Sequence, residues 1–152
     1  MKVYEVEDKV FARAKSRKGF TDLHWTIADE CDRADMPHPF IWLNRRANAK
    51  PGHYYYPSTR PKHNYPNGKI ELRPDSQHWV ALHECAHHLC SLYYATGFEN
   101  EPGYVASGHC AEWAEIYVAL VRRYYPASYG DRLEAGLAYL RPRYPSIGRM
   151  VA

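Results

Sequence analysis

The sequence has no apolar run that could cross a membrane, since no window approaches the ~18 uninterrupted apolar residues that a membrane helix needs. Its first eight residues include Glu5, Glu7 and Asp8, which makes them too acidic for a secretory signal peptide. It contains no internal repeat and no low-complexity segment. These absences predict a cytoplasmic protein with no membrane partner.

The sequence is also poor in cysteine and has no CxxC pair. Its four cysteines are Cys31, Cys85, Cys90 and Cys110. Nothing else suggests secretion, and a chain of this length does not need disulfides for stability. We therefore expect reduced, mostly buried thiols.

Length and charge place few limits on function. The chain has 152 residues, which predicts one compact domain spanning residues 1–152. Its net charge of +3 is mild. Such a charge fits a solvated surface as well as a nucleic-acid partner and does not decide between them.

Apolar periodicity and breaker residues divide the chain into helical segments around a stretch of short strands. Residues 37–74 hold seven of the eleven prolines and read as strands joined by turns. Helices are predicted at 4–16, 21–31 (capped by Thr21), 75–96 (capped by Asp75 or Ser76), 107–125 (capped by Ser107) and 131–140. Strands are predicted at 40–43, 53–56 and 69–73.

The run His83-Glu84-Cys85-Ala86-His87 lies inside the predicted helix 75–96. Histidines at i and i+4 share one helix face, close enough to bind one ion. Neutral imidazole binds zinc well, and in metalloproteases with this spacing the intervening glutamate is the general base toward the metal-bound water. The run therefore predicts a Zn²⁺ site with Glu84 as the catalytic residue.

The two sides of this predicted helix differ in polarity. One side collects the apolar residues Ala81, Leu82, Cys85, Leu89 and Leu92, and the other collects His83, Glu84, His87 and His88 with Val80. This layout suits a metal-binding helix lying over a core, and the alternative is a solvated polar face. His88 points about 100° away from His87 and is not expected to be a ligand.

A catalytic zinc needs a third protein ligand and an open position for water. The next predicted helix offers His109, Glu112 and Glu115. His109 heads the stripe formed with Trp113, Ile116 and Leu120. The His109 side chain should therefore point toward the element on which that helix packs. Glu115 lies on the opposite side of the helix, and Glu112 lies at the edge of the stripe. In a first helical turn, the helix dipole also favours the neutral, metal-binding form of His109. These arguments favour His109, and Glu112 stays open as a ligand or as an acceptor for a ligand histidine.

Two segments resemble known metallopeptidase elements. The run WVALHECAHHL, residues 79–89, resembles the active-site helix of zincin metallopeptidases, and GHCAEW, residues 108–113, resembles the HGxxF element that supplies the third histidine in SprT-like proteins. The chain is most similar to a family of small metallohydrolases of actinobacteria and their phages, with an LHELAHHL-like helix and a HGPxF-like helix start. Residues 2–7, KVYEVE, loosely match that family's RVYxAE-like beginning.

The resemblance, specific over about residues 79–120, implies a zincin-like α+β domain. In such a domain a small sheet packs on helices and the metal site lies between two helices. It implies Zn²⁺ held by His83, His87 and His109, with Glu84 as base and a peptide or protein as substrate. It also implies that the strand just before the metal helix, about 68–73, edges the cleft and could pair with an extended peptide.

Two cysteines depart from the family's pattern. Cys110 stands where the family has glycine after the third histidine, and Cys85 stands where such helices often have leucine. Cys85 points toward the core on the helical wheel and is expected to act as a small apolar residue. Cys110, next to a predicted ligand, is an alternative fourth metal ligand.

The predicted reaction is metal-assisted hydrolysis of an amide bond. Zinc would lower the pKa of its water and polarise the carbonyl, while Glu84 takes the water proton and passes it to the leaving amine. A further donor to the oxyanion is expected. The candidates considered for it are Tyr104 and the run Tyr54 to Tyr56.

Besides a zinc peptidase, or an amidase for small substrates using the same residues, two other functions stay open. One is a catalytically silent, zinc-stabilised interaction module. The other is a nucleic-acid-associated protein, because the stretch from Arg45 to Arg73 mixes Arg, Lys and Tyr, which can bind phosphates and stack on bases. SprT-like proteins are often associated with DNA, which adds to the hypothesis of a nucleic-acid partner. The alternative interpretation is that the stretch from Arg45 to Arg73 is a solvated loop region.

Overall fold

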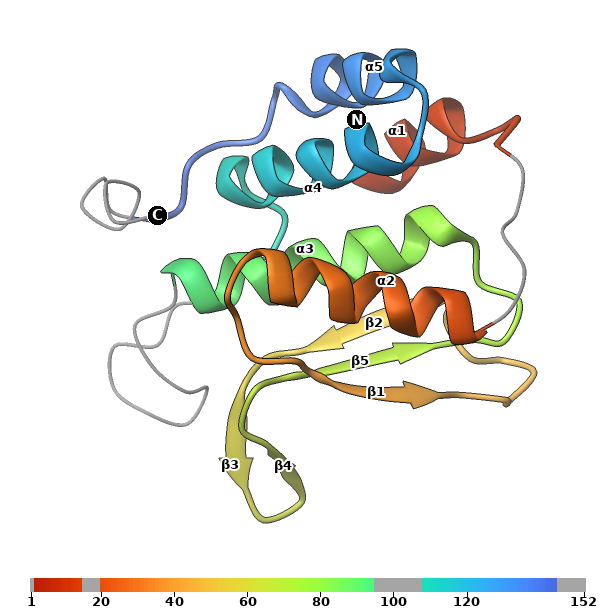
Figure 1. Cartoon of the computed structure of the whole chain (residues 1–152). Coiled ribbons are helices and arrows are strands. Elements are labelled where there is room, and N and C mark those ends of the chain that lie inside the picture. Colours follow the sequence, from red (N-terminus) through yellow and green to blue (C-terminus); the bar gives the residue numbers. More distant parts are fainter. Residues whose placement is uncertain (1, 15–19, 95–107, 145–152) are drawn as a thin grey trace.

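A computed structural model describes residues 2–14, 20–94 and 108–144, and in these ranges the fold is α+β, with five helices and a small mixed sheet (Figure 1). The helices are α1 (Val3–Val10), α2 (Phe20–Arg33), α3 (His78–Tyr94), α4 (Ala111–Tyr124) and α5 (Ala127–Leu137). The strands are β1 (Phe40–Leu43), β2 (Gly52–Tyr55), β3 (Ser58–Arg60), β4 (His63–Tyr65) and β5 (Lys69–Leu72). None of these helices is long and apolar enough to span a membrane.

Strand β5 lies at the centre of the three-stranded sheet, in the order β1-β5-β2. It runs parallel to β1 and antiparallel to β2, and Ile70 is opposite both Ile41 and Tyr54. The prediction that the strand at 68–73 edges the cleft is therefore wrong. Both faces of this strand are buried, since Glu71, on the opposite face from Ile70, is also buried and accepts a hydrogen bond from the Asn44 amide at 3.0 Å.

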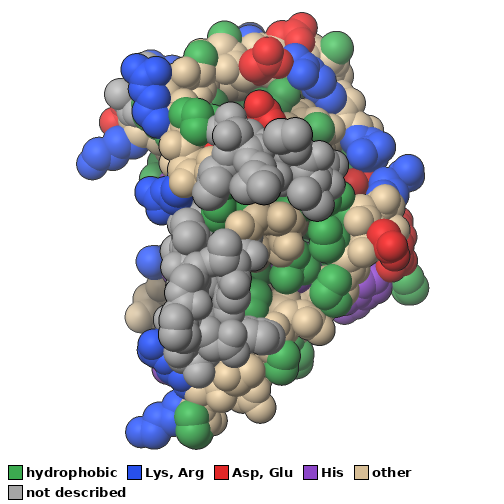
Figure 2. All heavy atoms as spheres, turned by 90° about the vertical axis from the view of Figure 1, so that its left-hand side faces the viewer, with side chains coloured by type: hydrophobic (Ala, Val, Ile, Leu, Met, Phe, Trp, Pro, Cys, Tyr) green, Lys and Arg blue, Asp and Glu red, His purple; other side chains and the backbone are tan. Residues whose placement is uncertain are grey.

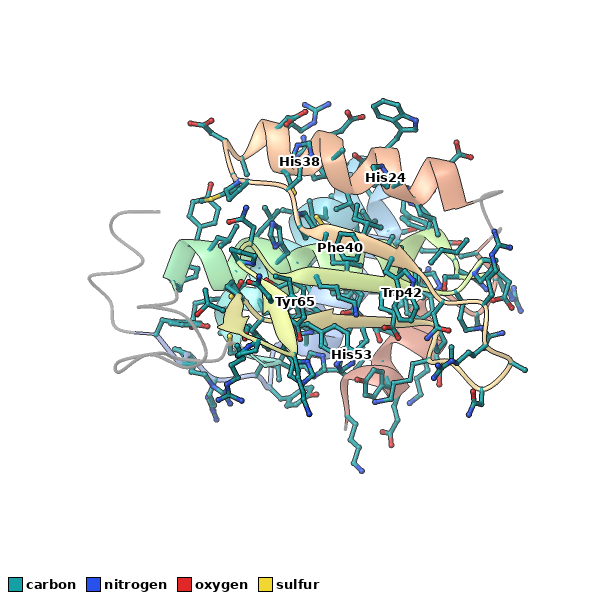
Figure 3. All side chains as sticks on the ribbon, turned by 90° about the horizontal axis from the view of Figure 1, so that it is seen from below. His24, His38, Phe40, Trp42, His53 and Tyr65 are labelled. Carbon is teal, nitrogen blue, oxygen red and sulfur yellow. The ribbon has the colours of Figure 1, made fainter. Side chains whose placement is uncertain are left out.

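The elements form successive layers (Figure 1). Helices α2 and α3 lie on one face of the sheet, α4 packs on α3, and α5 packs on α4 and α1. No described helix covers the other face of the sheet, which is seen from below in Figure 3. Strands β3 and β4 form a separate hairpin that extends from one end of the sheet.

Helix α3 is buried all round, because the sheet and α2 cover one side of it and α4 covers another. The apolar side is in the core as predicted, with Ala81, Leu82 and Cys85 fully inaccessible. The polar side is buried too, since His83 and Glu84 are only 4% and 7% exposed. A solvated polar face is thereby excluded.

Several predicted helix boundaries are wrong. Helix α1 ends at Val10 rather than at 16, because Phe11 leaves the helix and its ring stacks on Trp79 with centroids 5.0 Å apart. Helix α2 already includes Thr21, which therefore does not cap it. Helix α5 begins directly after Pro126 instead of at Asp131, since the fixed φ of proline suits a helix start.

The caps predicted for the two central helices also differ. The Ser76 hydroxyl donates to the carbonyl of Pro51 and accepts from the Arg73 amide, so it fastens the loop before α3. The N-cap of α4 is Cys110, and the predicted cap Ser107 lies outside the described residues, as does the predicted end of the metal helix at 96. All four cysteines are free and buried, as expected.

Candidate metal centre

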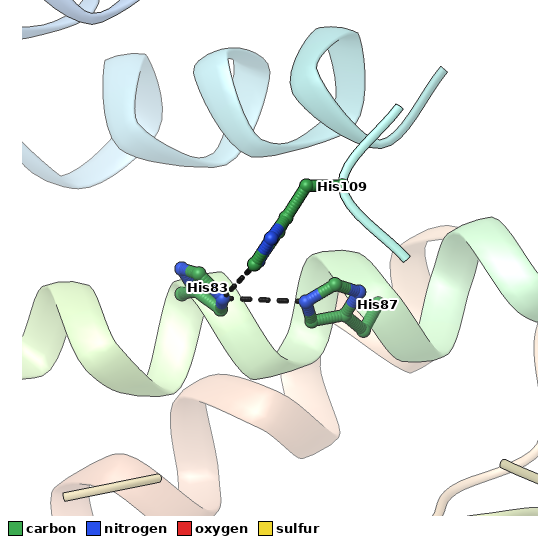
Figure 4. Close-up of side chains that lie close together, drawn as sticks. All are labelled: His83, His87 and His109. Atoms are coloured by element: carbon green, nitrogen blue, oxygen red, sulfur yellow. Dashed lines mark hydrogen bonds between the residues drawn. The ribbon is translucent and has the colours of Figure 1, made fainter. Parts of the chain in front are cut away.

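Three histidines meet between α3 and the segment that leads into α4 (Figure 4). The Nε2 atom of His83 lies 3.2 Å from Nε2 of His87 and 3.1 Å from Nε2 of His109. A tetrahedral ion bound to nitrogen at about 2.0–2.1 Å requires nitrogens about 3.3–3.4 Å apart. Two of the three nitrogen pairs therefore lie close to the spacing that one metal ion would impose, and all three ligand atoms lie within 4.8 Å of one another.

His109 reaches the cluster from a turn and not from a helix. Gly108 adopts a left-handed conformation with φ of +50°, which glycine accepts without strain. Its amide donates to the Tyr56 hydroxyl at 2.7 Å, and Cys110 is already the extended N-cap of α4. The placement of His109 in the first helical turn was therefore wrong, although the structure brings it to the two histidines of α3 as expected.

The other candidate ligands lie elsewhere. Glu112 accepts hydrogen bonds from the amides of Arg143 and Tyr144, so it holds the segment after α5. Glu115 is exposed and borders a hollow of about 360 Å³ between α4 and α5, away from the cluster. The Cys110 thiol is hydrogen-bonded to the Cys90 thiol, which lowers its pKa to about 7.

His88 lies outside the cluster, as predicted, but it is not solvated. Its ring is fully buried, with Nε2 2.7 Å from the carbonyl oxygen of Pro37 and Nδ1 3.3 Å from the Tyr54 hydroxyl. It therefore ties α3 to the sheet and to the chain before β1.

Trp113 forms a wall of the cluster. This fully buried ring is stacked on His87 at 5.2 Å and packs edge-on against His83 at 4.8 Å and His109 at 4.7 Å. Its indole N–H donates to the backbone carbonyl of His83 at 3.4 Å. One side chain of α4 thus limits the movement of all three imidazoles.

Glu7 of α1 is a functional candidate that the sequence reasoning missed. Its carboxylate is 1% exposed and accepts a hydrogen bond from Nδ1 of His83 at 2.5 Å, and the Tyr117 hydroxyl also bonds to it. A carboxylate at this position fixes the proton on Nδ1 and leaves the Nε2 lone pair for a metal. Glu7 lies 76 residues before His83, so no local spacing marks it.

Burial keeps two of the imidazoles neutral. It lowers the pKa of His87 well below the usual value and that of His109 to about 4, and the nearby His83 adds to both effects. Burial also disfavours a charge on His83, but the charges of Glu84 and Glu7 and the bond to Glu7 outweigh it and raise that pKa. Neutral imidazole is the form that binds metals, so the site is prepared for a cation.

Glu84 lies beside the cluster, and its pKa is raised. Burial raises its pKa to about 7, and the opposing effects of His83 and Lys50 do not cancel this rise. The backbone of β2 packs directly on it, since a Cβ on Gly52 would lie 3.0 Å from both Cγ and Oε1 of Glu84. Only glycine at this position allows so close an approach.

A pocket of about 210 Å³ opens onto the cluster. It is lined by Tyr4, Lys50, Gly52, His53, Tyr54, Tyr56, His83, Glu84 and His87. Tyr4, also missed from the sequence, lies at its rim. The ring is 62% exposed, parallel to His83 at 6.2 Å and edge-on to His109 at 5.7 Å.

The tyrosines proposed from the sequence as oxyanion donors have other partners. The Tyr54 hydroxyl is 3.0 Å from Ser91 Oγ, and the Tyr55 hydroxyl donates to Glu71 at 3.4 Å. The Tyr56 hydroxyl accepts from Gly108, and Tyr104 lies outside the described residues. Of the tyrosines discussed, Tyr4 combines exposure with contacts to two cluster histidines.

We find no match between this chain and any protein-family model, any curated protein or any solved structure. The family resemblance of its motifs is therefore not supported by these comparisons. What the site can do has to be argued from its geometry and chemistry.

Proposed function

We propose that the protein is a zinc-dependent hydrolase of zincin-like fold that cleaves amide bonds in peptides. The observation that carries the proposal is the cluster of three Nε2 atoms, with His83 3.2 and 3.1 Å from the other two, and the buried carboxylate of Glu84, which lines one pocket together with His83 and His87. Three imidazoles with room for a further ligand form the donor set of a catalytic zinc site. A purely structural zinc site normally has four protein ligands, and the described residues supply three.

The chain's own residues have separate roles in this chemistry. Zinc held by His83, His87 and His109 would supply Lewis acidity, lowering the pKa of a water molecule and polarising the substrate carbonyl. Glu84 accepts the proton of the attacking water and delivers it to the leaving nitrogen, a task that suits a pKa near 7. Tyr4, at the rim of the pocket, is the candidate donor to the developing oxyanion.

A peptide substrate is supported by the position of β2. This strand pairs with β5 on one side, and no described strand pairs with its other side. Gly52, His53 and Tyr54 of β2 also line the pocket. An extended peptide can add to such an edge through main-chain hydrogen bonds, which would bring a scissile amide to Glu84.

The test compares zinc content and hydrolysis of a mixed peptide library for four proteins: the native chain, Glu84→Gln, His87→Ala and Glu115→Gln. We expect one zinc per native chain. Glu84→Gln should keep the zinc but lose about 10²–10⁴-fold in rate, the usual contribution of a general base. His87→Ala should lose both zinc and activity. Glu115→Gln, the same change at an exposed position of α4, should behave as native.

Each contrary outcome has a definite meaning. Unchanged activity in Glu84→Gln would remove Glu84 as the base. A native protein with one tightly bound zinc and no hydrolysis would instead favour the zinc-stabilised interaction module. A native protein that binds no zinc would overturn the proposal.

A further inference from the structure

The positive charge of the chain is concentrated in one region. Residues 40–73, which contain all five strands, carry seven lysines and arginines but a single carboxylate, Glu71. The whole chain has 20 basic and 17 acidic residues, so the remaining residues hold 13 basic and 16 acidic side chains. The sheet region is therefore cationic within a chain that is otherwise slightly acidic.

The sheet face that carries no helix is rich in aromatic side chains (Figure 3). Strand pairing puts Phe40, Lys69 and Tyr55 in one row across the strands, and Trp42, Glu71 and His53 in the next row. Tyr65 of the hairpin packs against Tyr55 with centroids 5.6 Å apart. We call the surface formed by Phe40, Trp42, His53, Tyr55, Tyr65 and Lys69 the aromatic face.

Two rings of the aromatic face are open to solvent. Phe40 is 60% exposed and Trp42 is 39% exposed. They are alternate residues of β1 on the same side of the sheet, and hence about 6.6 Å apart along the strand. Rings this exposed add little to the core, and adjacent exposed aromatics usually mark a binding surface.

Lys69 contacts three rings of the aromatic face, including that of Trp42. Its Nζ lies 4.7 Å from the ring centre of Trp42, 4.6 Å from that of Tyr55 and 5.7 Å from that of Tyr65. Such cation–π contacts restrain the rings before any ligand arrives. The aromatic face is therefore an ordered platform, and because Lys69 also pairs with Glu71 at 3.7 Å, the positive charge open to a ligand is that of the residues around the platform.

Exposed basic residues flank this platform at both ends. Arg45, Arg46 and Lys50 lie in the connection between β1 and β2, and Arg60 and Lys62 lie in the β3–β4 hairpin at the opposite end of the sheet (Figure 1). Figure 2 shows blue side chains and no red ones at the foot of the molecule, where the hairpin lies. A polyanion crossing the platform would thus meet positive charge on either side.

We propose that the aromatic face binds single-stranded nucleic acid. Phosphates would contact the flanking lysines and arginines, which gives an affinity that falls with salt. Bases would stack on Phe40 and Trp42, as unpaired bases do on exposed aromatic side chains of sheets. A duplex hides its base faces, and an acidic peptide offers few rings to stack, so both fit this surface less well.

The test measures the anisotropy of a fluorescently labelled short oligo(dT) mixed with the full-length chain at about 50 mM salt and then at rising salt. We expect binding that weakens steeply with salt. Phe40→Ala and Trp42→Ala should each weaken it about tenfold, because each removes a stacking surface. Trp25→Ala is the matched control, since Trp25 is 62% exposed on α2, and it should bind as native.

Two further measurements test whether oligonucleotide binding is independent of hydrolysis and whether it differs from general attraction to polyanions. Glu84→Gln and chelator-treated protein should bind the oligonucleotide normally, because neither change alters the aromatic face. Unlabelled polyglutamate and a duplex of the same length should compete much less well than unlabelled oligo(dT). The proposal is overturned if no binding occurs at low salt, if Trp42→Ala and Trp25→Ala bind equally well, or if polyglutamate competes as strongly as the oligonucleotide.

Discussion

The two sides of the protein use histidines and aromatic rings in opposite ways. In the cluster between α3 and α4 the rings are buried, and burial keeps His87 and His109 uncharged. On the aromatic face the rings are partly exposed, and exposed lysines and arginines flank them at both ends of the sheet. The buried side is therefore suited to attract a metal cation, and the open side to attract an anion.

The difference comes from what covers each side of the sheet. Helices α2 and α3 cover the upper face, so a polar group there that lacks a protein partner or a metal costs stability. No described helix covers the lower face, where Phe40 and Trp42 stay exposed while Lys69 and Glu71 lie as an ion pair, 3.7 Å apart, among the rings. Burial thus separates two chemistries within one small fold, and the following predictions test that separation in order of decreasing effect.

Gly52→Ala tests whether the buried site depends on the sheet. The added methyl would collide with Val80 and Glu84, because its Cβ would lie 2.7 Å from Cγ1 of Val80 and 3.0 Å from Oε1 of Glu84. Displacing a catalytic group by about 1 Å can cost about 100-fold in rate, and we expect a loss of that order. Zinc content, the internal control, should not change because the side chains that the methyl would meet first, Val80 and Glu84, are not metal ligands. Full activity would show that the contact with β2 does not position Glu84.

Glu7→Gln tests whether α1 tunes the metal. The amide keeps the shape of the side chain but is a weaker acceptor for the Nδ1–H of His83, and loss of such a partner typically weakens metal binding 10–100-fold. Zinc affinity, measured by competition with a chelating dye, should fall by that amount. Glu5→Gln on the exposed side of the same helix is the matched control and should have native affinity.

The fall of kcat/KM toward low pH tests the raised pKa that burial gives to Glu84. The base must be ionised to accept a proton, and its pKa of about 7 without metal would be lowered by a bound dication. We therefore expect kcat/KM to rise tenfold per pH unit up to a midpoint at or below about pH 7. Zinc content measured at each pH distinguishes this effect from metal release. A flat profile with zinc retained would contradict the assignment.

Lys69→Met tests the order of the aromatic face and has the smallest expected effect. The change removes a cation from three rings and from Glu71, whose Oε1 is 3.7 Å away, so unfolding in urea should become easier by about 1 kcal/mol. Lys50→Met, at an exposed position, should change stability by less than about 0.5 kcal/mol. Equal effects of the two substitutions would mean that the cation–π contacts contribute nothing measurable.

Local patterns predicted local features of this protein well. The spacing of His83 and His87 indicated a shared helix face, and Leu23, Ile27 and Cys31 at helical spacing are all buried in α2. Strand β1 has the predicted bounds, because its run of apolar residues lies between proline-rich turns. Such features depend on neighbours in the sequence and can therefore be read from it.

Features that depend on distant partners were missed or misplaced. The central position of β5 follows from its pairing with both β1 and β2, which no pattern within residues 68–73 reveals. Glu7 is one of 17 acidic residues, and only folding brings it to His83. The direction of His109 was inferred by placing it in a helix, but that helix begins after it. The prediction that His109 lies near His83 and His87 was therefore correct, although the local structure used to derive it was wrong.

The positions of these residues along the chain bear on how the site assembles during folding. His83, His87 and His109 come from one helical pair and its connection, and the first and last of them are 26 positions apart in the sequence, whereas Glu7 lies 76 positions from its partner. The entropy lost on closing a loop increases with the length of that loop, and non-local contacts tend to form late. The histidines are therefore the part of the site that can gather first, and zinc taken up at that stage would serve as a nucleus around which α1 and the sheet complete the pocket.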